Sequence, residues 1–282
     1  MVAALYPAPR PQTVGEVLDA GFQIFASTLL GSLPYGVLAV LAGQLVNVHD
    51  LIAGRPLRGF GGTDLEWWAW YAAGMLLVLL IWGALWQRQA TLAAGGASSA
   101  RVELRRSLTV FPSLIGLTLI AGAALALVAA LGGGALALLG DPSALYLLVG
   151  LLLLPPALYL IVVYLFAYAA AVLCGMSALR ALPYSAALIR GRWWCTFLIL
   201  IVLAIVILVL YLLVGTCAAL VLSATGVPDV AVVTAVSAAV AMVMGAVSLP
   251  FVNAMLLATF GELRTRREGL DLGRRIERAL GN

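Results

Sequence analysis

Few side chains in this sequence have the types and spacing that enzymes use for catalysis. The single histidine, His49, is followed by Asp50, a pair that can supply an acid, a base or a metal ligand. No second histidine or cysteine stands near it, so we interpret the pair as a solvated loop feature. The glycine-rich stretch 54–62, GRPLRGFGG, lacks the spacing of a P-loop and is more simply a flexible loop. We predict no catalytic residue, no metal site and no cofactor.

The composition indicates the surroundings of the chain. Its 282 residues are 64% hydrophobic and 10% charged, with a mean hydropathy of +1.11. Soluble domains contain about 25% charged residues. The net charge of +4 is too small and too scattered to suggest nucleic acid. We therefore predict an integral membrane protein whose first partner is the lipid bilayer.

Six apolar runs are long enough to cross a bilayer core of about 30 Å, which needs about 20 helical residues. They predict an all-α, polytopic fold in a single integral membrane domain over residues 1–282. The predicted spans are about 28–47, 66–87, 108–138, 143–173, 194–222 and 230–259. Pro155 and Pro156 lie within the fourth span, where they either kink one helix or divide it into two.

The distribution of arginine predicts the orientation, because short cytoplasmic loops retain basic residues. With the N-terminus inside, only Arg55 and Arg58 of the 16 basic residues fall outside. Both termini are therefore predicted to be cytoplasmic, in what we expect to be a bacterial inner (plasma) membrane. Residues 261–282 then form a cytoplasmic, basic, amphipathic tail, which we expect to lie on the anionic leaflet, on the protein itself or on a partner.

Polar or amphipathic segments precede the three odd-numbered spans. Residues 13–25, TVGEVLDAGFQIF, begin with a capping-box pattern of Thr13 and Glu16 and place apolar residues on one helical face. Residues 99–111 and 177–197 stand in equivalent places before the third and fifth spans. We predict three helical hairpins, each introduced by a segment that lies in the cytoplasmic membrane interface.

The junctions of these segments contain side chains suited to a membrane interface. Arginine can extend to lipid phosphates while an indole ring fixes the depth of a helix. The residues concerned are Arg190, Arg192, Trp193, Trp194, Arg105 and Arg106. They predict an inner-leaflet boundary or, as a narrower alternative, a phospholipid headgroup site.

Small and polar residues within the spans leave two hypotheses open. Ser237, Ala241 and Gly245 repeat every four residues and form a small-residue ridge, which predicts close packing inside the bundle or against a second copy. A different set, Gln44, Asn47 and Asn253, can form hydrogen bonds between helices or line a mildly polar path. The middle of each span is free of Asp, Glu, His and Arg, which weighs against an ion-coupled pump.

Three junction motifs resemble a known family. RPQTVGEVLDAGFQIF, ALIRGRWWCTFLI and LRTRREGLDL are similar to segments of the bacterial family named for the membrane domain of glycerophosphodiester phosphodiesterases, and of related uncharacterised six-helix membrane proteins. The resemblance extends from Arg10 to about Leu272. In that family the domain is fused to a soluble phosphodiesterase domain or stands alone. The resemblance implies a six-helix membrane domain without the catalytic domain.

Together these features predict a non-enzymatic protein that serves as a scaffold or accessory subunit of a membrane assembly. Its partner would be another membrane protein or a second copy of the chain. The alternative is a permease or lipid-translocating protein for a neutral or lipidic substrate. That alternative predicts a continuous polar or lipid-sized cavity near the middle of the bilayer, lined by Gln44, Asn47 and Asn253.

Overall fold

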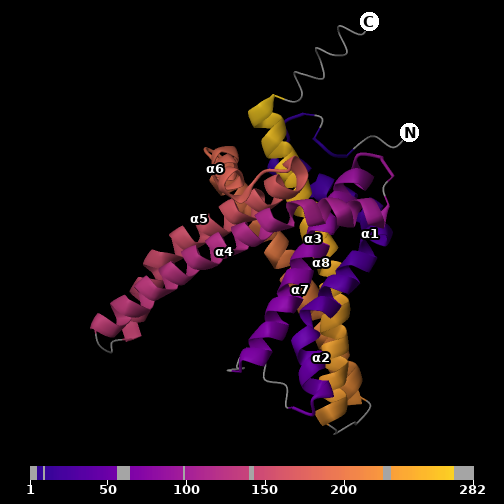
Figure 1. Cartoon of the computed structure of the whole chain (residues 1–282), viewed down its shortest axis with the longest axis vertical. Helices are drawn as coiled ribbons and strands as arrows, with labels where there is room; N and C mark the ends of the chain where they lie inside the picture. The colour runs from indigo at the N-terminus through magenta and orange to yellow at the C-terminus, as the bar shows by residue number, and fades with distance from the viewer. Residues whose placement is uncertain are drawn as a thin grey trace, which may run out of the picture. The chain divides into compact units, whose positions relative to one another are not determined.

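The computed structural model of the chain describes residues 5–8, 10–55, 64–97, 99–139, 143–224 and 230–269. These residues form helices and no strands (Figure 1). The helices are α1 (Val14–Gly43), α2 (Leu45–Ile52), α3 (Leu65–Ala93), α4 (Ala100–Leu139), α5 (Ser143–Cys174), α6 (Ala178–Ile189), α7 (Trp193–Ala224) and α8 (Val230–Glu268). The predicted all-α class is confirmed.

Six of the described helices, α1, α3, α4, α5, α7 and α8, are long and apolar enough to cross a membrane. They contain between 29 and 40 residues, whereas a bilayer core needs about 20. The helices therefore tilt or extend beyond the hydrocarbon. The predicted multi-pass membrane protein with six spans is confirmed, and α2 and α6 are short helices between spans.

The structure differs from the prediction at the starts of the first and third spans. Residues 13–25 are not a separate interfacial helix, because they form the beginning of the continuous helix α1. Residues 99–111 likewise run directly into α4. Gly15 and Gly21 lie in the first stretch without ending the helix, and the second stretch contains no glycine or proline. In the third segment, α6 does stand alone, since Gly191 adopts a φ of +83° just after it.

Two further expectations concern helix breaks. The first span does not continue to residue 47, because α1 ends at Gly43 and a new helix, α2, follows Gln44. The fourth span is one helix, since α5 continues through Pro155 and Pro156. The alternative of two shorter helices there is wrong. The sixth span extends beyond residue 259 to Glu268, and the rest of the predicted tail, from residue 270, lies outside the described residues.

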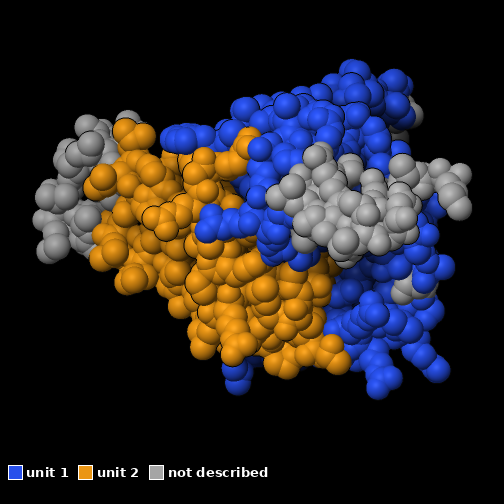
Figure 2. Space-filling view, turned by 90° about the horizontal axis from the view of Figure 1, so that it is seen from above, with its two compact units in different colours: residues 1–108, 194–282 blue, residues 109–193 orange. Residues whose placement is uncertain are grey.

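The chain divides into two compact units (Figure 2). Unit 1 comprises residues 1–108 and 194–282, and unit 2 comprises residues 109–193. The boundaries fall inside α4 and at the start of α7. We describe each unit by itself.

Close backbone approach holds the helices of unit 1 together. A Cβ atom added to Gly36 of α1 would overlap the carbonyl oxygen of Ala246 in α8. At Gly74 of α3, an added Cβ would lie 2.7 Å from the carbonyl oxygen of Ala42 in α1. Glycine at these two positions therefore allows α1 to contact both neighbours directly.

Aromatic and aliphatic side chains fill the remaining space beside α1. The ring of Phe251 in α8 lies 5.4 Å and 5.2 Å from the rings of Phe22 and Phe25, measured between centroids. Leu203 of α7 and Met255 of α8 are buried in the same cluster. This cluster fixes the first half of α7 against α1 and α8.

In unit 2, the short helix α6 packs on α5 and α4. The hydroxyl of Ser185 donates a hydrogen bond of 2.7 Å to the carbonyl oxygen of Val163. Near its start, the Cβ of Ala178 would lie 3.2 Å from a Cβ added to Gly116 of α4. The buried residues of α6 are Ala181, Ser185, Leu188 and Ile189, which share one face of the helix.

Candidate functional site

A carboxylate is buried among polar groups of three helices in unit 1. Glu103, in the first turn of α4, is only 1% exposed. Arg88 of α3 donates a hydrogen bond from Nη1 to Oε1 of Glu103 at 3.1 Å, and the hydroxyl of Tyr35 in α1 donates to Oε2. A buried charge is tolerated only when it is paired and hydrogen-bonded. This trio therefore connects α1, α3 and the start of α4.

A glycine in α1 leaves space for the guanidinium of Arg88 beside the helix. A Cβ added to Gly31 of α1 would lie 3.5 Å from both Nε and Nη2 of Arg88, so the guanidinium lies against the helix backbone there. One turn beyond Glu103, the hydroxyl of Ser107 donates to the carbonyl oxygen of Leu80 at 2.7 Å. The start of α4 is thus attached to α3 at two points.

A second set of hydrogen bonds begins at the next residue of α3. The side chain of Gln89 is fully buried, and its Oε1 accepts a hydrogen bond from Nδ2 of Asn253 at 2.7 Å. Its Nε2 donates to the carbonyl oxygen of Pro250 at 3.0 Å and to Oγ1 of Thr28 at 3.4 Å. Gln89 therefore joins α3 to both α1 and α8.

We call these side chains the polar network. Its members are Thr28, Tyr35, Arg88, Gln89, Glu103 and Asn253. Two buried oxygens in this region, Oδ1 of Asn253 and Oγ of Ser32, have no hydrogen-bond partner among the described residues. Such groups are uncommon in protein interiors because each forfeits its bonds to water.

The structure places the three predicted lining amides in two locations. Asn253 belongs to the polar network. The side chain of Gln44 accepts a hydrogen bond from that of Asn47 at 2.6 Å, at the junction of α1 and α2. Gln44 also lines a crevice of about 340 Å³ together with Ala241 and Gly245 of α8.

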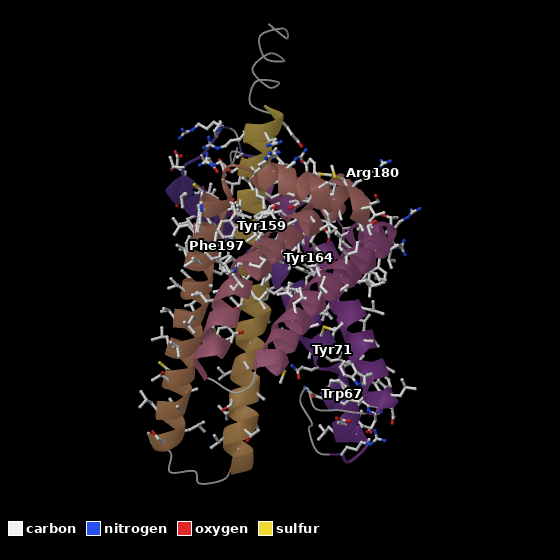
Figure 3. All side chains as sticks on the ribbon, turned by 90° about the vertical axis from the view of Figure 1, so that its left-hand side faces the viewer. Trp67, Tyr71, Tyr159, Tyr164, Arg180 and Phe197 are labelled. Atoms are coloured by element: carbon white, nitrogen blue, oxygen red, sulfur yellow. The ribbon has the colours of Figure 1, made fainter. Side chains whose placement is uncertain are left out.

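The residues of the small-residue ridge on α8 lie in two different environments. At Gly245, an added Cβ would lie 3.1 Å from Cγ2 of Val40 in α1, so this position packs inside unit 1. Ser237 and Ala241 line a crevice of about 490 Å³ between α7 and α8, which we call the α7–α8 crevice, and Ala241 also lines the smaller crevice beside Gln44. Figure 3 shows these two helices as the orange-brown and gold ribbons. The other lining residues are Tyr211, Gly215, Ala218, Ala219, Leu222, Ser223, Val233 and Val240.

The predicted interface residues lie at or near the protein surface. Trp194 is 75% exposed, and its ring centroid lies 6.4 Å from that of Phe197. Arg190 is exposed in the turn after α6, whereas Arg192 and Trp193 are half-buried. On α4, Arg105 and Arg106 are exposed. Their role toward lipid stays a prediction.

The solvated-loop interpretation of His49 and Asp50 is wrong, because both lie in α2 and Asp50 is 1% exposed. The Nε2 atom of His49 lies 3.0 Å from Oε1 of Glu66, and Arg55 donates to Oε2 of the same carboxylate at 2.9 Å. The imidazole stacks on Trp70 at 4.9 Å between centroids. Neither carboxylate oxygen of Asp50 has a hydrogen bond among the described residues, and Oδ1 lies 3.8 Å from Nδ1 of His49.

The described residues of the N-terminal segment, 5–8 and 10–12, contact the ends of α3 and α8. The backbone N–H of Leu5 donates to the carbonyl oxygen of Ala93 at 2.8 Å. The hydroxyl of Thr265 donates to the carbonyl oxygen of Ala8 at 2.9 Å. Arg266 donates from Nη2 to the carbonyl oxygen of Gln12 at 2.7 Å. The segment thus fastens the end of α8 to the beginning of α1 and the end of α3.

Sequence reasoning missed most of the polar network. It placed Arg88 on the inner side of the membrane and Glu103 within the interfacial segment 99–111, and it gave no role to Tyr35 or Gln89. One signal was available on the first span, where Thr28, Ser32 and Tyr35 recur at helical spacing on one face. A polar stripe in an otherwise apolar helix indicates a contact with another polar helix face.

Chemically, the polar network joins helices to one another. Its carboxylate, guanidinium, phenol and amide groups bond to partners on other helices. In the described part of the chain, no three His, Cys, Asp or Glu side chains are grouped so that they could hold a metal ion. Comparison with protein-family models, with curated proteins and with solved structures finds no match to this chain.

Proposed function

We propose that the protein is a non-enzymatic scaffold or accessory subunit of a membrane assembly. In this proposal the α7–α8 crevice receives a transmembrane helix of a partner protein or of a second copy. The observation that carries the proposal is the contrast along α8. Its second half is joined to Gln89 of α3 by Asn253 and Pro250, whereas its first half lines an open crevice at Ser237 and Ala241.

The second half of α8 is held rigidly against the neighbouring helices. Hydrogen bonds and ion pairs between buried side chains are strong in a low-dielectric interior, so they favour one arrangement of the helices over others. The bond from Asn253 to Gln89 and the pair of Arg88 with Glu103 both link different helices. A docking face on unit 1 would therefore be held in place before a partner arrives, which reduces the entropy lost on binding.

The open half has the composition of a helix-docking surface. Gly215, Ala218 and Ala219 line the crevice from α7, while Ser237 and Ala241 line it from α8. Small residues let two helix backbones approach closely, so that van der Waals contacts and interhelical hydrogen bonds can form in lipid. Both walls of the crevice thus favour a helix as the occupant.

The proposal also includes the orientation of the chain in the membrane. We infer that both termini are cytoplasmic, in a bacterial inner membrane, because nearly all arginines then lie on the inner side. The contacts of Ala8 with Thr265 and of Gln12 with Arg266 support termini on one side, since they bring the two ends of the described chain together. The α7–α8 crevice would then open toward the outer half of the bilayer.

The proposal is tested by a substitution that fills the α7–α8 crevice, followed by measurement of the oligomeric state in mild detergent. Gly215 lines the crevice, and a Cβ added to it meets nothing within 4 Å, so we expect Gly215→Leu to fill the crevice and the protein to fold. The wild-type protein extracted in mild detergent should migrate as an assembly, and Gly215→Leu should migrate as a monomer. Gly15→Leu is the matched control, because an added Cβ there also meets nothing. A wild-type protein that is always a monomer and moves a substrate across liposomes would overturn the proposal.

A permease or lipid-translocating protein is the second candidate. The size of the α7–α8 crevice, about 490 Å³, and the hydroxyl groups of Tyr211, Ser223 and Ser237 in its lining favour this alternative. Vesicles that contain the purified protein should then show flux of a labelled lipid or neutral solute, and Gly215→Leu should reduce that flux. Equal flux in the wild-type and variant vesicles would exclude this crevice as the route.

A further inference from the structure

The side chain of His49, the single histidine of the chain, lies between two carboxylates. It belongs to α2, the short helix that follows Gln44. Its Nε2 atom lies 3.0 Å from Oε1 of Glu66 in α3, and its Nδ1 atom lies 3.8 Å from Oδ1 of Asp50. Each nitrogen of the imidazole ring therefore has a carboxylate oxygen as its neighbour.

The contact of His49 with Asp50 lacks a proton. Asp50 is 1% exposed, and neither its two oxygens nor the buried Nδ1 of His49 has a hydrogen bond among the described residues. Their separation of 3.8 Å is too long for a hydrogen bond, which spans about 2.7 to 3.2 Å between nitrogen and oxygen. A buried carboxylate keeps its charge only at a high cost when it is unpaired. One proton on Nδ1, with a closure of about 1 Å, would give both atoms a partner.

The contact of His49 with Glu66 explains why Nδ1 lacks the proton when the ring is neutral. An ionised carboxylate only accepts hydrogen bonds, so Glu66 favours the proton on Nε2. A neutral imidazole carries one N–H, which leaves Nδ1 as an acceptor that faces the acceptor oxygens of Asp50. The doubly protonated imidazolium instead donates to both carboxylates. The two carboxylates therefore match the imidazolium better than the neutral ring.

The face of the imidazole makes a third contact that favours the same charge. The ring of His49 stacks on that of Trp70 in α3, with 4.9 Å between centroids and 24° between planes. A cation within about 6 Å of an indole ring is attracted to the face of that ring, and tryptophan is the best of the aromatic side chains in this respect. Trp70 therefore stabilises the imidazolium as well as fixing the ring orientation.

The other charged groups around α2 leave the surroundings of His49 negative. Arg55, just after α2, donates to Oε2 of Glu66 at 2.9 Å and offsets the charge of that carboxylate. Asp64, the residue before α3, is exposed and adds a negative charge. Helix α1, which also contacts α2, has no charged residue after Asp19. The charge of Asp50 therefore has no cation to balance it except a protonated His49.

We propose that His49 and Asp50 form a proton-binding site that attaches α2 to α3. The ligand is a proton on Nδ1, which the imidazolium donates to the carboxylate of Asp50. Because imidazole in water changes its charge between about pH 5 and 8, the site fills as the pH falls through that range. A metal ion fits less well than a proton, because both atoms are buried and no three His, Cys, Asp or Glu ligands are grouped in the described part of the chain.

The site makes one end of unit 1 sensitive to pH. Figure 1 shows α2 at the opposite end of unit 1 from the last turns of α8. Under the orientation proposed above, the end that contains α2 faces the outside of the cell, so the site would respond to external pH. Proton binding itself depends neither on that orientation nor on the α7–α8 crevice, because its residues lie in α2 and α3.

Because the chain has one histidine, NMR can follow the two ring nitrogens of His49 directly. Full-length protein without a histidine tag is labelled with nitrogen-15 histidine and titrated in detergent from about pH 5 to 8. In the wild type, both nitrogens should carry a proton at low pH, and Nδ1 should lose its proton as the pH rises. Asp50→Asn should shift the midpoint to lower pH, because the imidazolium loses its buried anionic partner. The matched control Asp19→Asn, at an exposed position in α1, should leave the midpoint unchanged.

Thermal unfolding provides a second measurement. His49→Gln keeps a polar side chain at this position but cannot take up a proton. Because the folded protein binds the proton more tightly than the unfolded chain, acidification from about pH 8 to 6 should raise the melting temperature of the wild type relative to His49→Gln. This stabilisation is present at low pH and is lost as the pH rises. At pH 8, Asp50→Asn should be at least as stable as the wild type, and this advantage should shrink at pH 6.

Three results would overturn the proposal. The first is the same titration midpoint in the wild type and in Asp50→Asn. The second is the same response of the melting temperature to acidification in the wild type and in His49→Gln. The third is a change in both ring-nitrogen signals when an equal amount of zinc is added at pH 8, which would assign the site to a metal ion. If His49→Gln fails to fold, the NMR comparison still decides the outcome, because Asp50→Asn keeps the shape of the side chain.

Discussion

Asn253 of α8 donates a hydrogen bond of 2.7 Å to the side-chain carbonyl of Gln89 in α3, and both residues are fully buried. The two residues are 164 positions apart in sequence. Their bond fixes the relative position of the second and sixth membrane-spanning helices within unit 1. It also explains why Asn253 does not share a crevice with Gln44, although both side chains carry an amide.

Replacing only one of the two residues that form this hydrogen bond should destabilise the protein. Asn253→Leu leaves the carbonyl of Gln89 buried without its donor, which costs about 1 to 3 kcal/mol. The double variant Asn253→Leu with Gln89→Leu should recover part of that loss, because no amide is then left unpaired. Thermal unfolding of both single variants and the double variant in detergent measures the coupling. Strictly additive losses in this double-mutant cycle would contradict the bond.

Removal of the buried carboxylate should cost more than removal of an exposed one. Glu103→Ala leaves Arg88 without its anionic partner, and breaking a buried ion pair from one side costs about 3 to 5 kcal/mol. Glu268→Ala is the matched control, because Glu268 pairs with Arg264 at 2.8 Å on the exposed side of α8. Such surface pairs contribute about 0.2 to 1 kcal/mol. Unfolding transitions of the two variants at the same pH should differ accordingly, and equal losses would show that Glu103 is not buried.

The close contact of α1 with α8 predicts a strong position effect for added methyl groups. Gly36→Ala would place a Cβ on the carbonyl oxygen of Ala246, so the helices must separate, at a cost of about 1 to 3 kcal/mol. Gly215→Ala meets nothing, and the gain in helix propensity should stabilise the chain by about 0.5 to 1 kcal/mol. Melting temperatures that shift in opposite directions would agree with this packing. A higher melting temperature for Gly36→Ala would disprove the contact.

The buried carboxylate of Asp50 predicts a stabilising substitution. Because neither of its oxygens has a hydrogen bond among the described residues, its desolvation is poorly compensated. Asp50→Asn keeps the shape and removes the charge, so the melting temperature should stay the same or rise. Asp19→Asn serves as the control at an exposed position, where Gln23 donates to the carboxylate at 2.8 Å. A marked fall in the melting temperature for Asp50→Asn alone would mean that its charge is paired.

Hydropathy and length were sufficient to predict the helical class and the six spans, because a bilayer demands long apolar helices. The capping box of Thr13 with Glu16 was also readable, since its two partners are only three residues apart. In contrast, the partner of Gln89 is distant in sequence, and its identity depends on which helix faces meet. Glu103 was misjudged for a related reason: its neighbours Arg105 and Arg106 resemble a surface segment, whereas the helical turn places Glu103 on the buried face.

The most direct test of the proposed function is site-specific photocrosslinking in native membranes. A diazirine side chain is introduced at Ser237, in the α7–α8 crevice, or at Val209, which is exposed on α7 and is not among the crevice residues. The proposal predicts a discrete protein adduct from position 237, its loss when Gly215→Leu is added, and little protein adduct from position 209. Lipid adducts alone at both positions would contradict the account.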